Sequence, residues 1–315
     1  MNFKSIDYFL TVARERSFTK AAAQHHITQQ TISADIAILE RELGQVLFLR
    51  KVPLQLTYAG EVFLRYAQEF HRSYTALIQE FQDISNEATG VLRIGVSYAR
   101  GHALMPNLIA GFQRRFPRVA VHLLEDSNEQ LQKHLLEGNV DLAIANYSQT
   151  RAEIERIPFY REELVLLISD GLLEQVFPGE KAHVLAQLSS GQYDSLSQCP
   201  FVLGIPDDIG GAIGRQFLRA QHLQPPIQAQ SENMDTLLSL CALGIGACFS
   251  PENLIRTTLT EEQLRSVHII RLPEASYQIY FGVLRNSYQW NMIRAFIQTA
   301  IENQNPKRVS SEFGP

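Results

Sequence analysis

The pattern of the chain changes at Gly90. Before this residue, apolar side chains recur every three or four residues, which is typical of amphipathic helices. After it, short runs of strand-forming residues alternate with helical segments, which favours an α/β fold. At 315 residues the chain is also longer than one ordinary domain. We therefore expect a helical N-terminal part, joined near residue 90 to an α/β C-terminal part.

The first sixty residues predict three helices. One runs from about Phe3 to Ala13, Ser17 caps a short second helix, and Thr28 caps a longer one that ends at Gly44. When two helices are joined by such a tight turn, the polar start of the second can meet base edges in DNA. The same polar residues are also typical of a solvated helix start, so spacing alone leaves both interpretations open.

A longer pattern favours DNA binding. Its residues are Ser17-Phe18-Thr19, Ala21-Ala22, Thr28-Gln29, Ile32-Ser33, Ile36, Leu39-Glu40, Leu43-Gly44, Leu47-Phe48, Arg50 and Leu56-Thr57-x-Ala59-Gly60. This pattern resembles the LysR-type transcriptional regulators, which implies a winged helix-turn-helix over residues 1–58, all-α apart from its wing. The resemblance implies base contacts from the start of the third helix and phosphate contacts from the wing and the helix caps. The candidate DNA-binding residues are Thr19, Thr28, Gln29, Gln30, Thr31, Ser33, Arg50 and Lys51.

Some positions depart from the family pattern. Gln30 stands where the family commonly has proline, and Ala34 where it often has arginine. Asp35 would lie beside an anionic groove, although its carboxylate could accept a hydrogen bond from a cytosine amino group. His25 occupies a position that is usually apolar. We infer an atypical operator preference rather than a loss of DNA binding.

The charge of the chain is only mildly asymmetric. The net charge is −5, of which residues 1–60 carry +2 and the remaining residues −7. Because the first sixty residues have few cations, we expect the DNA affinity to depend on the avidity of a dimer. We also expect it to fall steeply with salt.

Residues 59–89 predict one long linker helix with a narrow apolar stripe. The stripe alternates spacings of four and three: Phe63, Ala67, Phe70, Tyr74, Leu77, Phe81 and Ile84. This pattern is typical of a coiled coil between two chains, whereas a helix that packs on its own domain needs a wider stripe. We therefore favour a dimerisation seam, which the family resemblance also implies, together with pairing of dimers into tetramers. Residues 86–90 should break the helix.

The C-terminal part predicts two lobes. We expect strands at 91–96, 119–124, 140–145, 163–168, 201–203, 227–230, 247–249, 267–270 and 278–284, and helices at 103–116, 128–136, 212–220, 234–243 and 289–301. The alternation predicts a parallel α/β architecture. Lobe 1 would comprise about 90–165 and 270–303 and lobe 2 about 166–269, with a polar tail at 304–315.

This two-lobed order resembles the periplasmic-binding-protein-like effector domain of the same family. The matching residues are Leu92-Arg93-Ile94-Gly95, Leu104-x-Pro106, Phe112-x-x-x-Phe116-Pro117, Leu135-x-x-Gly138-x-x-Asp141-Leu142-Ala143-Ile144 and Gly244-Ile245-Gly246-x-x-x-x-Pro251. The resemblance implies that a small-molecule effector binds between the lobes. Residues 170–197 form a longer connection than the family usually has, and we assign them no role.

Ligands of open α/β sheets bind beyond the carboxyl ends of the strands, where loops and helix N-termini meet. Here those positions hold the candidate effector-binding residues Ser97, Tyr98, Arg100, Ser127, Asn128, Asn146, Ile205 and Met234. Helix N-termini favour an anion, and Arg100 could pair with a carboxylate. The alternative is that Ser97 and Ser127 are simple helix caps and that Arg100 is only solvated.

Several function classes are disfavoured. The sequence has no nucleotide-binding glycine pattern, no metal-ligand spacing and no nucleophile elbow, so we expect no catalytic site, metal or cofactor, and no enzyme. A solute-binding protein would need an export signal, which the first residues do not resemble. A thiol-based redox regulator of the same architecture is a further alternative. Cys241 and Cys248 lie in apolar sequence, however, and Cys199 precedes a strand, which favours buried hydrophobic residues.

The remaining features concern compartment and partners. No apolar run approaches the roughly 18 residues that span a bilayer, and three cysteines are too few for a disulfide framework. We expect a cytoplasmic protein without membrane contacts. Its expected partners are double-stranded DNA, a small-molecule effector and a second copy of the chain, with RNA polymerase as a further candidate.

Overall fold

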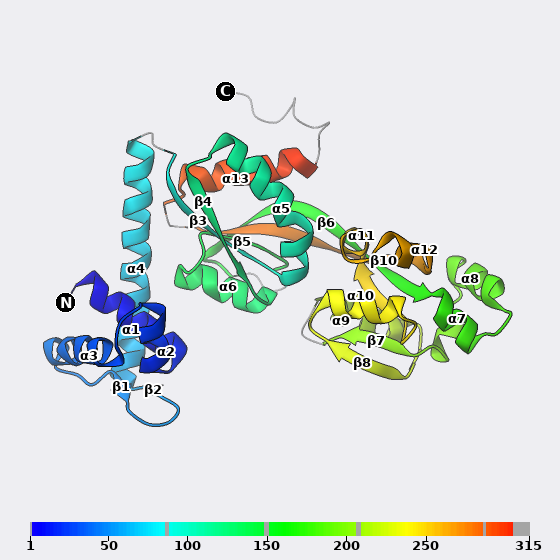
Figure 1. The fold of residues 1–315 in the computed structure, drawn as a ribbon, viewed down its shortest axis with the longest axis horizontal. Helices are drawn as coiled ribbons and strands as arrows, with labels where there is room; N and C mark the ends of the chain where they lie inside the picture. The colour runs from blue at the N-terminus through cyan, green and yellow to red at the C-terminus, as the bar shows by residue number, and fades with distance from the viewer. Residues whose placement is uncertain (1, 86–87, 148–150, 206–208, 286–287, 305–315) are drawn as a thin grey trace. The chain divides into compact units, whose positions relative to one another are not determined.

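The computed structural model describes residues 2–85, 88–147, 151–205, 209–285 and 288–304 (Figure 1). The chain divides into two compact units. The first comprises residues 1–88 with the short segments 136–139 and 286–291, and the second comprises the rest of the C-terminal part. Residues 86–87 of the expected helix break and nearly all of the expected tail lie outside the described residues.

The N-terminal unit begins as a winged helix-turn-helix. Its elements are α1 (Phe3–Glu15), α2 (Phe18–Gln24), α3 (Gln29–Leu43), β1 (Phe48–Leu49), β2 (Gln55–Leu56) and α4 (Tyr58–Ile84). Side-chain oxygens cap all four helices, because Asn2, Ser17, Thr28 and Thr57 each accept a hydrogen bond from a backbone N–H of the first turn. At the other end of α3, Gly44 adopts a positive φ of 67° that glycine tolerates best.

The core of this unit explains how α4 is attached. Phe9, Ile32, Ile36 and other apolar residues of α1 to α3 pack together, and the first turns of α4 join the same core. Gly60 permits this close approach, since a Cβ there would lie 2.1 Å from the Leu47 carbonyl oxygen. His25 stands at a position that is usually apolar, and its ring makes a polar contact there: the Nε2 atom lies 2.9 Å from the Thr11 hydroxyl.

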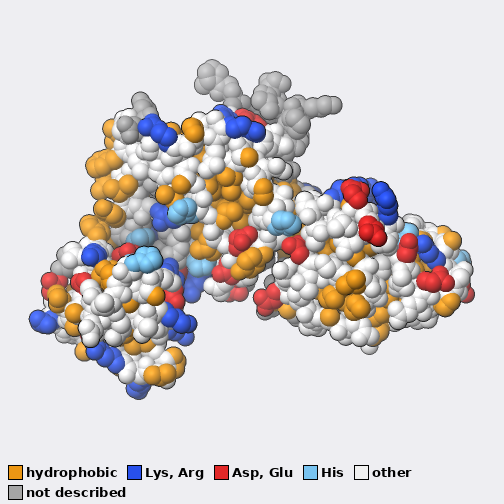
Figure 2. All heavy atoms as spheres, in the orientation of Figure 1, with side chains coloured by type: hydrophobic (Ala, Val, Ile, Leu, Met, Phe, Trp, Pro, Cys, Tyr) orange, Lys and Arg blue, Asp and Glu red, His pale blue; other side chains and the backbone are white. Residues whose placement is uncertain are grey.

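The position of the first α4 residues corrects the expected seam. Phe63 and Ala67 are 9% and 0% exposed and belong to the core of their own unit, so they are not available to a second chain. The stripe is exposed only further along α4, at Phe70, Tyr74, Leu77, Phe81 and Ile84. Figure 2 shows a column of hydrophobic side chains along this part of the helix.

The C-terminal unit contains lobe 1 and lobe 2. Its first elements are β3 (Gly90–Val96), α5 (Tyr98–Arg115), β4 (Val119–Glu125), α6 (Asn128–Glu137), β5 (Leu142–Ala145) and β6 (Ile154–Ser169). Lobe 2 adds α7 (Asp170–Val176), α8 (Lys181–Ser189), a 3-10 helix (Asp194–Ser197), β7 (Phe201–Gly204), α9 (Ile209–Ala220), β8 (Ile227–Ser231), α10 (Met234–Ala242), β9 (Cys248–Pro251), α11 (Glu252–Thr258) and α12 (Glu261–Arg265). The last elements are β10 (Val267–Leu284) and α13 (Asn291–Gln304).

The main sheet is mixed, whereas the alternation of strands and helices predicts a parallel architecture. Its order is β4-β3-β5-β10-β6-β9. The strands β4, β3 and β5 are parallel, whereas β10 is antiparallel to both β5 and β6, and β6 to β9. The reason is that β6 leaves lobe 1 and β10 returns to it, so these two long strands cross side by side in opposite directions (Figure 1).

Helices cover both faces of the lobe 1 sheet. Successive residues of a strand point to opposite faces. A Cβ at Gly95 would lie 2.9 Å from Leu131 of α6, while the neighbouring Val96 faces α5 at Gly101. Phe112 of α5 in turn packs against Phe296 of α13. The carboxyl ends of β3 and β5 therefore lie beside the N-termini of α5 and α6.

Lobe 2 contains the stretch 170–197, to which the sequence assigned no role. Its residues Leu172, Phe177, Leu188 and Leu196 belong to the same core as Phe201. At the start of α7, Asp170 contacts Lys181 and the imidazole of His268. The hydrogen bond from Lys181, followed by that from His268, lowers the pKa of Asp170. The stretch is a structural layer of lobe 2.

Candidate nucleic-acid interface and effector site

The start of α3 is ordered by its own cap and is open to a partner. The Thr28 hydroxyl lies 3.1 Å from the Thr31 backbone nitrogen, which donates to it, and 2.8 Å from the Thr31 hydroxyl. The side chains of Gln29, Gln30 and Thr31 are exposed, and Ser33 is half-buried. The first turn therefore presents amide and hydroxyl groups, which can hydrogen-bond to base edges.

Asp35 is turned away from that surface. Its carboxylate lies 3.3 Å from the hydroxyl of Ser5, a buried residue of α1, and the same hydroxyl is 3.1 Å from the Asn2 amide oxygen. Asp35 is half-buried and ties α3 to the start of α1. This contact gives Asp35 a structural role. An acidic residue at this position is therefore explained without a hydrogen bond to a cytosine.

The wing supplies exposed cations. The strands β1 and β2 pair Phe48 with Leu56, and the segment between them carries Arg50 and Lys51, both exposed. The Arg50 guanidinium lies 5.9 Å from the centre of the Phe18 ring at the start of α2. Thr19 and its neighbour Lys20 are also exposed at this start. Lys20 was not among the predicted residues, although its place in the first turn of α2 was the available signal.

In lobe 1 the structure brings together polar residues that follow the ends of β4 and β5 with residues inside β6 and β10. The Asn146 backbone nitrogen, just after β5, donates to the side-chain oxygen of Asn128 at 3.1 Å. The Asn146 side-chain nitrogen donates to the Gln278 backbone oxygen at 3.0 Å. The side chain of Gln278 donates in turn to the Tyr160 carbonyl oxygen at 2.9 Å. Sequence reasoning missed Gln278 because it lies inside a strand, where a polar side chain carries no motif.

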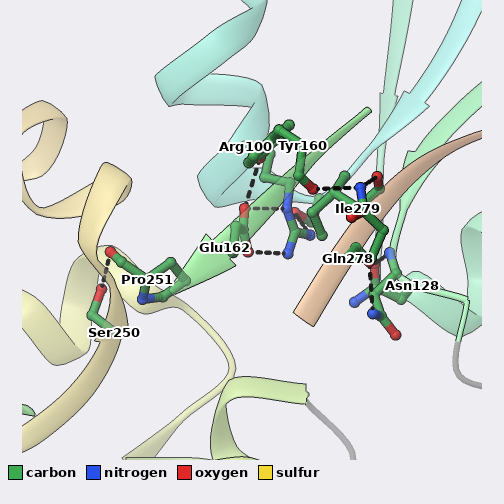
Figure 3. Close-up of polar contacts among 10 residues, drawn as sticks. Arg100, Asn128, Tyr160, Glu162, Ser250, Pro251, Gln278 and Ile279 are labelled. Atoms are coloured by element: carbon green, nitrogen blue, oxygen red, sulfur yellow. Dashed lines mark hydrogen bonds and ion pairs between the residues drawn. The ribbon is translucent and has the colours of Figure 1, made fainter. Parts of the chain in front are cut away.

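Arg100 does not lie free at this edge. Its guanidinium makes two hydrogen bonds to the Glu162 carboxylate, of 2.9 and 2.8 Å (Figure 3). A third hydrogen bond, of 3.0 Å, goes to the Ser97 hydroxyl. The Tyr160 hydroxyl donates to the same carboxylate at 2.7 Å. Arg100 and Glu162 are 4% and 1% exposed. The expectation of a solvated or ligand-pairing arginine is thereby replaced by a buried ion pair.

The ion pair shifts the pKa of its members. Burial alone would lower the pKa of Arg100 and raise that of Glu162, but the opposite charge and the hydrogen bonds outweigh it. The pKa of Arg100 is consequently raised, and that of Glu162 is below its ordinary range. Burial, followed by the charge of Glu162, raises the pKa of Tyr160. Both members of the pair stay charged at neutral pH.

The other predicted effector residues lie at helix starts or strand ends. Ser127 accepts from the Gln130 backbone nitrogen at 3.4 Å and is a helix cap. Tyr98 is 60% exposed at the start of α5. Ile205 follows β7 and is half-buried, and Met234 opens α10 and packs against apolar residues of lobe 2. The structure thus brings Asn128 and Asn146 into contact in lobe 1 and ties Ser97 to Arg100 nearby in the chain, whereas Ile205 and Met234 lie in lobe 2.

Helices of the two lobes approach each other near this edge. His102 of α5 has its Nδ1 3.6 Å from a carboxylate oxygen of Asp235 in α10. The other oxygen of Asp235 accepts from the Thr258 hydroxyl of α11 at 2.8 Å. Among the residues that the structure describes, no three His, Cys, Asp or Glu side chains gather as metal ligands.

All three cysteines are buried, as the sequence predicts. Burial raises the pKa of Cys199 to about 11. The pKa of Cys248 is also raised, first by a hydrogen bond with Cys241 and then by burial. Thiols in this state are poor nucleophiles, so their environment is that of structural cysteines.

Two family models match the chain. The bacterial regulatory helix-turn-helix model of the lysR family covers residues 3–61, and the LysR substrate binding domain covers residues 85–305. The chain belongs to the LysR family. It is a LysR-type transcriptional regulator with an N-terminal DNA-binding domain and a C-terminal effector-binding domain.

Relatives and solved structures match almost the whole chain. The uncharacterized HTH-type transcriptional regulator YcgK of Bacillus subtilis is 28% identical over 312 residues, 96% of this chain and 95% of that protein. The transcriptional activator IlvY of Haemophilus influenzae is 24% identical over 298 residues, 94% and 98% of the two chains.

Two solved structures illustrate the shared fold. A full-length OxyR variant from Pseudomonas aeruginosa has a TM-score of 0.70 at 20% identity, with 95% of this chain and 94% of that chain covered. CbnR in complex with its target DNA has a TM-score of 0.61 at 19% identity, with 95% and 99% covered. In the described residues of this regulator, no helix is long and apolar enough to cross a membrane.

Proposed function

We propose that this LysR-type regulator contacts its operator through the first turn of α3 and through the wing. Gln29, Gln30, Thr31 and Ser33 contact base edges in the major groove. Thr19, Thr28, Arg50 and Lys51 contact phosphates, with Lys20 beside them. The observation that carries this assignment is the exposed, capped first turn of α3, next to a separate set of exposed cations.

The regulator acts as a dimer that is held together by α4. Five apolar side chains along its C-terminal half are at least 41% exposed: Phe70, Tyr74, Leu77, Phe81 and Ile84. Their spacing of four and three suits a coiled coil with a second copy of the chain. Such a pair would present two helix-turn-helix units to two half-sites. Pairing of dimers into tetramers, a cytoplasmic location and contact with RNA polymerase complete the proposal.

The effector binds at the edge where the lobes approach each other. Ser97, Asn128 and Asn146 offer hydroxyl and amide groups for this contact, and Tyr98, Ser127, Ile205 and Met234 are the further residues that we assign to the site. Because Arg100 is already paired with Glu162, it positions Ser97 instead of binding a carboxylate. An anionic effector would then be bound by the backbone N–H groups at the starts of α5 and α6.

The test is selection of DNA by the purified full-length regulator from random and genomic fragments, at near-physiological salt. We expect the bound fragments to share a site with dyad symmetry, since two copies would bind two half-sites. Genes beside such sites would narrow the chemistry of the effector. Bound fragments without any shared motif would contradict the proposed base contacts.

A further inference from the structure

The exposed face of α3 continues beyond its polar first turn as an apolar line. Gln30, Ala34 and Ile38 are spaced by four residues and therefore lie one above the other on the helix. Ala34 is exposed, and Ile38 is 48% exposed. The helix thus offers an amide followed by two methyl-bearing side chains.

The neighbouring positions do not compete for the same surface. Ile32 and Ile36 are fully buried in the core of the winged domain. Asp35 is held by Ser5 of α1. From Gln29 to Glu40 the sequence contains no lysine or arginine, the residues that most often contact guanine. The base-facing part of α3 therefore lacks the cation that a guanine contact would use.

We infer that Ala34 contacts the C5-methyl group of a thymine in the major groove, with Ile38 extending the apolar surface. The inference rests on the proposed docking of α3. An alanine methyl is one of the few side-chain groups suited to a thymine methyl, and no other base presents a methyl group there. Ala34 is then a specificity-determining residue, although it forms no hydrogen bond through its side chain.

The experiment uses the full-length regulator and the site obtained by DNA selection. Each thymine of one half-site is replaced in turn by uracil, which removes only the methyl group, and the dissociation constant is measured. At one position we expect uracil to weaken binding about fourfold, the equivalent of ~0.8 kcal/mol for one buried carbon. The other thymines should tolerate the exchange.

Variants assign the effect to Ala34. In Ala34→Gly, thymine and uracil at that position should bind equally tightly, because the protein methyl is gone. Ala37→Gly is the matched control, since it carries the same loss of helix propensity on the same helix and should keep the fourfold difference. Ala34→Arg should shift the preference at that base pair toward guanine.

The outcomes separate this inference from the proposed function. A shared dyad site without any uracil-sensitive thymine would overturn the role of Ala34 and leave the base contacts of Gln29 and Gln30 standing. A sensitivity that persists unchanged in Ala34→Gly would also overturn it. Failure to select any shared site would overturn the proposed function and, with it, the inference.

Discussion

Arg100 and Glu162 are both buried and have lost their contacts with water. Each side chain replaces part of those contacts for the other. Transferring two charges out of water costs several kcal/mol for each ion, and only close contacts offset this cost. Here the two guanidinium hydrogen bonds are joined by the hydroxyl of Tyr160. The pair links the start of α5 to β6, so it fixes Ser97 at the edge where we place the effector.

Removing one partner of this pair should destabilise the C-terminal unit. For Glu162→Gln we expect the free energy of unfolding to fall by about 3–5 kcal/mol, because the buried charge of Arg100 loses its counterion. Unfolding in urea measures this. Glu163→Gln changes the exposed neighbour and should alter the free energy by no more than about 0.5 kcal/mol. Equal effects of the two changes would contradict the structural role of the pair.

The same pair predicts how stability depends on pH. The pKa of Glu162 is lower in the folded protein than the ordinary value of about 4.3. Its stabilisation is therefore complete above that value and is lost as the pH falls through the folded pKa. We expect the unfolding free energy to decrease more steeply below about pH 4.3 in the unchanged protein than in Glu162→Gln. Parallel pH profiles of the two proteins would argue against this assignment.

Gln29 and Arg50 should have different effects on DNA binding. Arg50→Ala should weaken binding to every sequence by a similar factor, because a wing cation contacts phosphate. Gln29→Ala should relax the preference at one base pair, by roughly 1–3 kcal/mol. Binding to a panel of single-base operator variants distinguishes the two. If both changes weaken binding to all variants alike, Gln29 does not contact a base.

At the scale of helices and strands, local signals predicted the fold well wherever a residue's own chemistry decides the boundary. Thr28 and Gly44 delimit α3 as expected, because capping and a positive φ are local properties. The sequence pattern predicts that α5 begins at 103, whereas the helix begins five residues earlier, at Tyr98. The residues Arg100 and Gly101 look like a loop in sequence, but burial against Glu162 and Glu125 makes them helical.

The sites were predictable to a similar extent. Polar residues at strand ends, such as Asn128 and Asn146, could be found from the order of the elements. The partner of Arg100 could not be found in this way, because Glu162 is 62 residues away and lies inside a strand. Likewise, the stripe of α4 reveals its spacing but not that Phe63 and Ala67 are used within their own unit.

A charge within the exposed part of α4 should separate the dimer. For Leu77→Lys we expect a monomer, because a lysine would be buried at the centre of the seam without a counterion. Glu69→Lys introduces the same side chain at an exposed position off the stripe and should leave the dimer intact. Sedimentation of both variants measures the oligomeric state. A dimeric Leu77→Lys would exclude this surface as the seam.

For the whole molecule, the modest charge of residues 1–60 makes DNA binding depend on two copies. A monomeric Leu77→Lys variant should lose about 10²–10⁴-fold in affinity for the complete operator, since the second contact is no longer intramolecular. Its affinity for an isolated half-site should be unchanged. The slope of log affinity against log salt should also be halved, because half as many phosphates are neutralised. An unchanged slope would show that one copy makes all the contacts.

The place of β10 in the main sheet also determines when the effector-binding domain can be completed during synthesis. When only the residues up to 266 have been synthesised, β4-β3-β5 and β6-β9 are two separate pieces of sheet. Only β10, residues 267–284, pairs with both β5 and β6 and joins them. The nascent regulator therefore carries a helix-turn-helix long before it has an effector domain to control it.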